Sequence, residues 1–133
     1  MHALPLDRAS ITTLVHRFYD DVRADPVLGP VFDGAIGARW DPHLERMVDF
    51  WSTVMLGTQA FQGNVFGKHM ALQGIEAEHF LRWLTLFEAT AQRLFEPAQA
   101  SEFITVARRI AASLQYGYFG KVLVTGAPQQ EGA

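Results

Sequence analysis

Apolar residues recur along this chain at intervals of three and four, which is the spacing of one face of an α-helix. The first such stretch covers about residues 7–24, with Ile11, Leu14, Val15, Phe18 and Val22 on its apolar face. Asp7 or Ser10 is suited to cap its start, and Pro26 ends it because proline disfavours helical geometry in the preceding residue. Tyr19 follows Val15 by four residues and therefore shares the edge of the buried face.

A second helix is predicted over residues 41–56. Asp41 can serve as the N-cap, Pro42 suits the first helical position, and Gly57 suits the residue after the end. The apolar face of this helix contains His43, Met47, Phe50, Trp51 and Val54. We therefore expect a packed helix with a histidine at the head of an aromatic stripe.

The remaining pattern is also helical. Between the first two helices, residues 27–32 predict a compact apolar turn and residues 33–39 a loop that contains two glycines. Two further helices are predicted from residue 75 or 76 to residue 95, and from Pro97 onward. Their apolar faces contain Phe80, Trp83, Leu84, Phe87, Ala91 and Leu94, and then Phe103, Ala107, Ile110, Ala111, Leu114 and Tyr118. No alternating pattern is long enough to build a sheet, so the expected fold class is all-α.

These helices leave a long connection over residues 58–74, with the sequence VFGKHMAL at residues 65–72. A connection of this length in a small domain is typical of a functional loop, and its apolar residues argue against disorder. Taken alone, His69 in this segment is either a loop histidine that caps a neighbouring element or a ligand of a metal ion. The aromatic residues elsewhere favour the second interpretation, because a neutral imidazole in apolar surroundings is a good axial ligand for haem iron.

The composition of the chain limits the kinds of site and partner that it can have. The chain has 133 residues, so we expect one domain over residues 1–125 and a disordered tail over residues 126–133. Hydrophobic residues make up 49%, with 10 phenylalanines, which is enough to line a large ligand as well as a core. The absence of cysteine excludes disulfides, thiolate metal sites and iron–sulfur clusters. The net charge of −3 is mixed along the chain, which argues against a nucleic-acid partner.

The N-terminal residues carry no secretory signal pattern, and no stretch approaches the ~18 apolar residues of a membrane span. We therefore expect a cytoplasmic protein without a membrane partner, either a monomer or a weak dimer.

In their order and spacing, four stretches of the chain resemble the truncated haemoglobins, most specifically their third group. They are FYDDVRADPVLGPVF at residues 18–32, His43 with Phe50-Trp51, GKHMAL at residues 67–72, and FLRWLTLF at residues 80–87. The glycine-pair signatures of the other two groups are missing, which fits the third. The resemblance implies a two-over-two helical sandwich with a short or absent first globin helix.

The resemblance also implies a haem b site. In it, His69 is the proximal iron ligand and His43 the distal-helix histidine, while Lys68 pairs with a haem propionate or is a solvated lysine. Tyr19, Phe32 and Trp83 match the distal tyrosine, the phenylalanine that packs on haem, and the distal tryptophan. The other residues expected to line the haem are Met47, Phe50, Trp51, Phe66 and Phe87.

The implied function is the binding of dioxygen and other diatomic ligands. Dioxygen draws electron density from ferrous iron, so the hydroxyl of Tyr19 and the indole N–H of Trp83 should hold it, each contributing about 1–3 kcal/mol. Slow release argues against efficient transport and favours redox chemistry on O₂, NO or peroxide, with an unidentified reductase. A peroxidase-like enzyme and a sensor or scavenger that acts by binding are the alternatives. His43 is interpreted as a gate, a proton donor or a second iron ligand.

Overall fold

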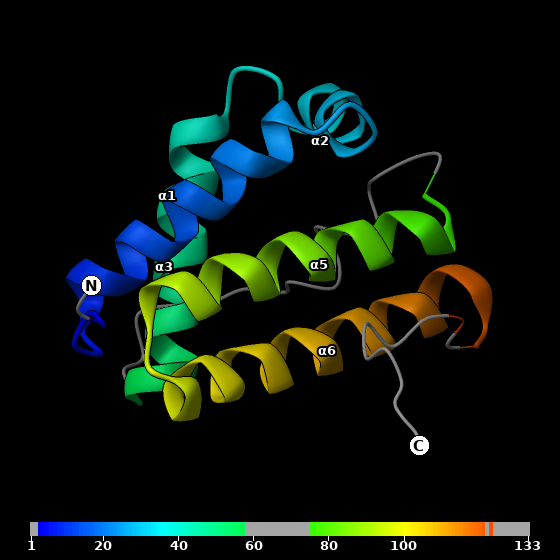
Figure 1. The fold of residues 1–133 in the computed structure, drawn as a ribbon. Coiled ribbons are helices and arrows are strands. Elements are labelled where there is room, and N and C mark those ends of the chain that lie inside the picture. The colour runs from blue at the N-terminus through cyan, green and yellow to red at the C-terminus, as the bar shows by residue number, and fades with distance from the viewer. Residues whose placement is uncertain (1–2, 58–74, 122, 124–133) are drawn as a thin grey trace.

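The computed structural model describes residues 3–57, 75–121 and 123, and the described part is helical without a strand (Figure 1). Its helices are α1 (Arg8–Ala24), α2 (Leu28–Ile36), α3 (Trp40–Leu56), α5 (Ala77–Leu94) and α6 (Pro97–Phe119). None of them is long and apolar enough to cross a lipid bilayer. The predicted tail and the connection over residues 58–74, with Phe66, Lys68 and His69, lie outside the described residues.

The helices form two layers. α5 and α6 lie side by side and run in opposite directions, while α1 packs on α3 and also contacts α5 (Figure 1). The backbone N–H of Leu4 donates to the carbonyl of Leu94 at 2.8 Å, which ties the N-terminal segment to the end of α5. Arg8 joins α1 to α3 through an ion pair with Asp49 at 2.7 Å. This arrangement confirms the predicted two-over-two helical sandwich.

The predicted boundaries of α1 are confirmed. Asp7 accepts a hydrogen bond from the backbone N–H of Ser10 at 2.8 Å, and the Ser10 hydroxyl oxygen accepts one from the backbone of Asp7 at 3.1 Å. This reciprocal cap satisfies backbone donors that a helix start leaves free. The buried face of α1 comprises Ser10, Ile11, Leu14, Val15, Phe18, Tyr19 and Val22, in agreement with the helical spacing.

The prediction of a short turn and a loop is wrong for residues 28–36, which form α2. The Asp25 carboxylate accepts hydrogen bonds from the backbone N–H groups of Val27 and Leu28 at 2.8 and 2.9 Å. It thereby stabilises the start of a new helix immediately after ending the previous one. Pro30 is compatible with α2 because it lies in the first turn, where a backbone N–H has no partner within the helix.

The start of α3 also differs from the prediction, because Trp40 is its first residue and Asp41 is not the N-cap. The chain reverses at Gly37, whose φ of 59° favours glycine. The indole N–H of Trp40 then donates to the Asp33 carboxylate of α2 at 2.8 Å. This bond across the turn brings Trp40 into the first turn, and Pro42 is tolerated there for the same reason as in α2.

Candidate functional site

Tyr19 lies in a cluster of aromatic rings where α1, α2 and α3 meet. The centroid of its ring is 5.1 Å from His43, 5.8 Å from Trp40 and 6.3 Å from Phe32, and each pair meets edge to face. Only 4% of Tyr19 is exposed. The fold thus brings together three residues that the sequence placed in the site, namely Tyr19, Phe32 and His43.

Burial of the Tyr19 side chain raises the pKa of its hydroxyl well above the ordinary value for tyrosine. The phenol is therefore protonated at neutral pH. A protonated phenol in an apolar cluster is a hydrogen-bond donor for which water competes little. Its O–H could donate a hydrogen bond to a small ligand that carries negative charge.

His43 lies in the first turn of α3 and turns its ring inward. Its imidazole is 5.1 Å from Tyr19 and 5.7 Å from Trp40 in edge-to-face contacts, and its Nε2 atom is buried. The side chain of His43 is thus partly buried among aromatic rings. By contrast, His16 is exposed, and His79 Nδ1 accepts a hydrogen bond from the backbone of Glu76 at 2.8 Å, which gives it a structural role at the start of α5.

A second group of aromatic rings comes from α3 and α5. Phe87 stacks on Trp51 at 5.1 Å and on Trp83 at 6.0 Å, with interplanar angles of 19° and 14°. Phe18 joins the two groups, because it meets Tyr19 at 4.8 Å and Trp83 at 5.6 Å. Trp83 is partly exposed whereas Phe87 is buried, so the stack runs from the core toward the surface.

Met47 and Phe50 lie on α3 as the spacing predicts. Met47 is buried one turn after His43, and Phe50 contacts Trp51 at 5.3 Å. Their contacts with a haem, like those of Trp51 and Phe87, stay predictions. The predicted iron ligand His69 belongs to the connection that is not described. Within residues 3–57, 75–121 and 123, no group of three or more histidine or acidic residues could hold a metal ion.

Trp40 also belongs to this cluster, although the sequence analysis did not predict it as a site residue. It is 6% exposed and contacts both Tyr19 and His43. The signal was present, because Trp40 precedes His43 by three residues and Met47 by seven, which is the spacing of a single helical face. The expectation that the helix begins at Asp41 left Trp40 outside that face.

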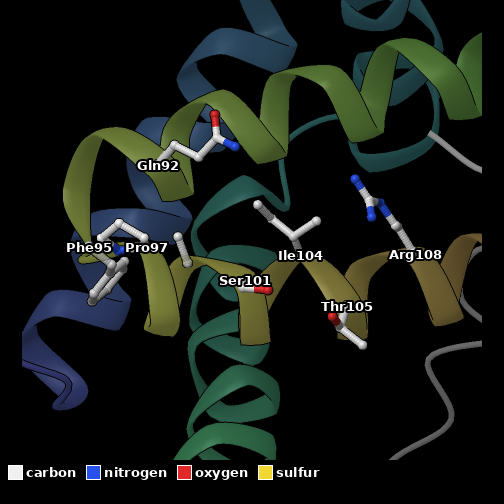
Figure 2. Close-up of a pocket in the computed structure, with 8 residues that line it drawn as sticks. Gln92, Phe95, Pro97, Ser101, Ile104, Thr105 and Arg108 are labelled. Carbon is white, nitrogen blue, oxygen red and sulfur yellow. The ribbon is translucent and has the colours of Figure 1, made fainter. Parts of the chain in front are cut away.

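A separate pocket of about 410 Å³ lies between the end of α5 and the first half of α6 (Figure 2). Ile104 and Arg108 extend from α6 toward α5 in this pocket. The other lining residues are Gln92, Phe95, Pro97, Ala100, Ser101 and Thr105. None of the predicted site residues lines the pocket, and Arg108 is already paired with Glu88 at 3.0 Å.

The described cluster thus combines aromatic rings with the hydroxyl of Tyr19 and the imidazole of His43. No family model matches the chain. The chain is 32% identical over 121 residues to a group 3 truncated haemoglobin from Campylobacter jejuni, an alignment that covers 86% of this chain and 95% of that protein. The chain belongs to the group III truncated haemoglobins. The crystal structure of a group III truncated haemoglobin from Campylobacter jejuni has a TM-score of 0.83 to it at 30% identity, covering 90% of this chain and 96% of the other.

Membership in the group III truncated haemoglobins implies that this protein is a haem-binding globin. It confirms the resemblance carried by the stretches around Tyr19, His43 and Trp83. In this truncated haemoglobin, Tyr19 and His43 come from α1 and α3, and Trp83 comes from α5. The two layers of the sandwich therefore contribute to one aromatic assembly.

Proposed function

We propose that this truncated haemoglobin binds haem b through His69 and holds dioxygen or another diatomic ligand with Tyr19, Trp83 and His43. The observation that carries the proposal is the contact between buried Tyr19 and partly exposed His43, whose rings are 5.1 Å apart within an aromatic cluster. Hydrogen bonds made in such apolar surroundings are stronger than those made in water. A polar diatomic ligand is small enough to accept a hydrogen bond from these side chains.

A haem b would supply an iron at which a diatomic ligand binds and gains partial negative charge. The chain's own part is to present donors toward that charge. The Tyr19 hydroxyl is protonated at neutral pH, as in any tyrosine, and burial moves its pKa still higher. The Trp83 indole N–H is a donor at every pH. Both lie on helices that pack in the core, so their donors are held in place before a ligand arrives.

The remaining predicted contacts have apolar or electrostatic roles. Phe32, Met47, Phe50, Trp51, Phe66 and Phe87 would cover the haem faces, and Lys68 would pair with a propionate. Phe32 is 5% exposed and 6.3 Å from Tyr19, which supports a place beside the ligand donors. Apolar walls of this kind exclude water and strengthen the hydrogen bonds to the ligand.

His43 has a different part, because it belongs to the first turn of α3 and not to the middle of a helix. From that position, its imidazole can admit a ligand by turning aside or can hold a proton at Nε2. Strong retention of the ligand favours redox chemistry on O₂, NO or peroxide over transport, with electrons from an unidentified reductase. A role as a sensor or scavenger requires binding alone.

The ligand assignment is tested by the absorption spectrum of purified His69→Ala protein. We expect the variant to lose its haem band and to recover it when imidazole is added, because free imidazole replaces the missing donor. His16→Ala removes an exposed histidine and is the matched control, with an unchanged spectrum. A normal five-coordinate ferrous spectrum for His69→Ala would contradict the assignment.

The reaction is tested separately with the unaltered protein. Slow dioxygen release with weak peroxide turnover supports ligand binding and oxygen chemistry. Rapid peroxide turnover, lost in both His43→Ala and Trp83→Phe, would assign peroxidase-like activity instead.

A further inference from the structure

Trp40 lies between the ligand donors and the surface of the molecule. On its inner side, its ring meets Tyr19 at 5.8 Å and His43 at 5.7 Å, with interplanar angles of 62° and 88°. Both contacts are edge to face, an arrangement that depends on the direction of each ring. A rotation of the indole would therefore change the space available to both neighbours.

The outer side of Trp40 is anchored by two charged groups. Its indole N–H donates to the Asp33 carboxylate at 2.8 Å, and the guanidinium of Arg23 lies 4.5 Å from the centroid of the ring. Arg23 also pairs with Asp33 at 3.5 Å. The anchor thus joins α1, α2 and α3 at the corner where Tyr19 and His43 meet.

The two anchoring contacts differ in how they constrain the indole. A hydrogen bond to a carboxylate is directional, and only one orientation of the indole satisfies it. The guanidinium of Arg23 attracts the face of the ring but tolerates sliding, and its side chain is 48% exposed. Asp33 is therefore the group that selects the orientation of Trp40.

We propose that Trp40 is a positioning residue that sets the directions of the Tyr19 hydroxyl and the His43 imidazole, and that the hydrogen bond from Trp40 to Asp33 fixes Trp40 for this purpose. The effect on a diatomic ligand rests on the proposed function. The effect on the two side chains rests on the contacts alone. Packing by itself would accept another large ring at position 40, whereas positioning requires the indole N–H.

The test compares Trp40→Phe, Asp33→Ala and the double variant as haem-loaded ferrous proteins with carbon monoxide bound. The C–O stretching frequency reports hydrogen-bond donors beside the ligand and is insensitive to stability. We expect both single variants to shift this frequency in the same direction and to accelerate dioxygen release by about twofold to tenfold. The double variant should match the larger single effect, because both changes break one bond.

Two control variants separate positioning from packing. Asp33→Asn retains an acceptor oxygen for the indole and should keep a frequency close to that of the unaltered protein. Phe95→Leu disturbs a buried ring that stacks on Phe103 at 4.8 Å, and it should lower stability without moving the frequency. Unchanged frequencies in both Trp40→Phe and Asp33→Ala would overturn the proposal, as would an equal shift in Phe95→Leu.

A second measurement does not require haem. NMR spectra of the protein as purified, with labelled tyrosine and histidine, should show altered ring resonances of Tyr19 and His43 in Asp33→Ala, where the indole of Trp40 is retained, but not in Phe95→Leu. Unchanged resonances overturn the positioning role. If the unaltered protein takes up no haem, the proposed function fails while this measurement still decides the role of Trp40.

Discussion

Among single residues, Tyr19 and Trp83 lie farther from a helix end than His43 does. Tyr19 is in the middle of α1 and Trp83 in the middle of α5, where neighbouring turns fix the backbone on both sides. His43 is in the first turn of α3, where helix ends open most easily. This difference suggests that the first two residues determine how long a ligand stays, and that His43 determines how it enters.

Substituting the donors tests this division. Tyr19→Phe and Trp83→Phe should each change dioxygen dissociation by about tenfold, because each removes a hydrogen bond in a dry pocket. Their effects should not add, because both donors serve one ligand. His43→Ala should mainly change association rates, measured by flash photolysis alongside stopped-flow dissociation. Faster dissociation in His43→Ala alone would reverse the assignment.

Phe32 is predicted to contribute to haem retention more than to folding. Phe32→Ala should keep most of the helical circular dichroism but lose haem faster to an acceptor protein, because burying a phenylalanine contributes about 2–3 kcal/mol. Phe95→Ala is the matched control, since Phe95 is equally buried but stacks on Phe103. Equal haem loss from the two variants would place Phe32 in the general core.

Among the elements, α2 depends on one close approach to α1. A Cβ atom at Gly29 would lie 2.6 Å from the carbonyl oxygen of Arg23, which is too close for any real contact. Gly29→Ala should therefore lower the free energy of unfolding by about 1–3 kcal/mol through displacement of α2. The measurement is the midpoint of urea denaturation.

Gly34 provides the comparison within the same helix. A Cβ at Gly34 meets nothing within 4 Å, so Gly34→Ala should be neutral or stabilise the protein by up to about 1 kcal/mol. Similar midpoints for the two alanine variants would show that the close approach at Gly29 is not maintained in solution.

The sequence predicted those elements whose signal is local. Periodicity located α1, α3, α5 and α6, and Asp7 and Pro97 marked two of their starts correctly. α2 was missed because its start depends on a second role of Asp25, and because Pro30 and the nearby glycines suggested a loop. Trp40 was missed although its spacing fits the apolar face of α3, because Asp41 and Pro42 indicated a later helix start.

At the scale of the molecule, an ion pair joins the corner between α1 and α2 to α5. Arg82 donates from Nε and Nη2 to the Asp25 carboxylate at 3.1 and 2.8 Å. Partial burial opposes ionisation of Asp25, but Arg82 and the backbone N–H groups of Leu28 and Val27 outweigh it and lower the pKa of its carboxyl. The hydrogen bond with Asp25 correspondingly raises the pKa of Arg82.

The lowered pKa of Asp25 predicts acid sensitivity. The unfolded chain binds a proton at this carboxyl more readily than the folded chain, so the contribution of Asp25 is present above about pH 4 and is lost as pH falls through its folded pKa. Asp25→Asn should lower the unfolding free energy by about 1–2 kcal/mol at pH 7. On acidification, the unfolding free energy of this variant should fall less than that of the unaltered protein.

Urea denaturation at pH 7 and pH 3 measures this difference. Asp20→Asn removes an exposed carboxylate of α1 and serves as the control. If Asp25→Asn and the unaltered protein lose the same unfolding free energy between pH 7 and pH 3, Asp25 does not cause the acid sensitivity.

Phe18 and Tyr19 are neighbours in the sequence, yet Phe18 faces Trp83 and Phe87 while Tyr19 faces His43 and Trp40. Successive residues of an α-helix point about 100° apart, so one rotation of α1 about its axis sets both directions. With the start fixed at Asp7, inserting or deleting a single residue before Phe18 would turn both rings away from their partners together. The length of this stretch is consequently under stricter constraint than the identity of its exposed residues, and α1 should tolerate many surface substitutions but no change in length.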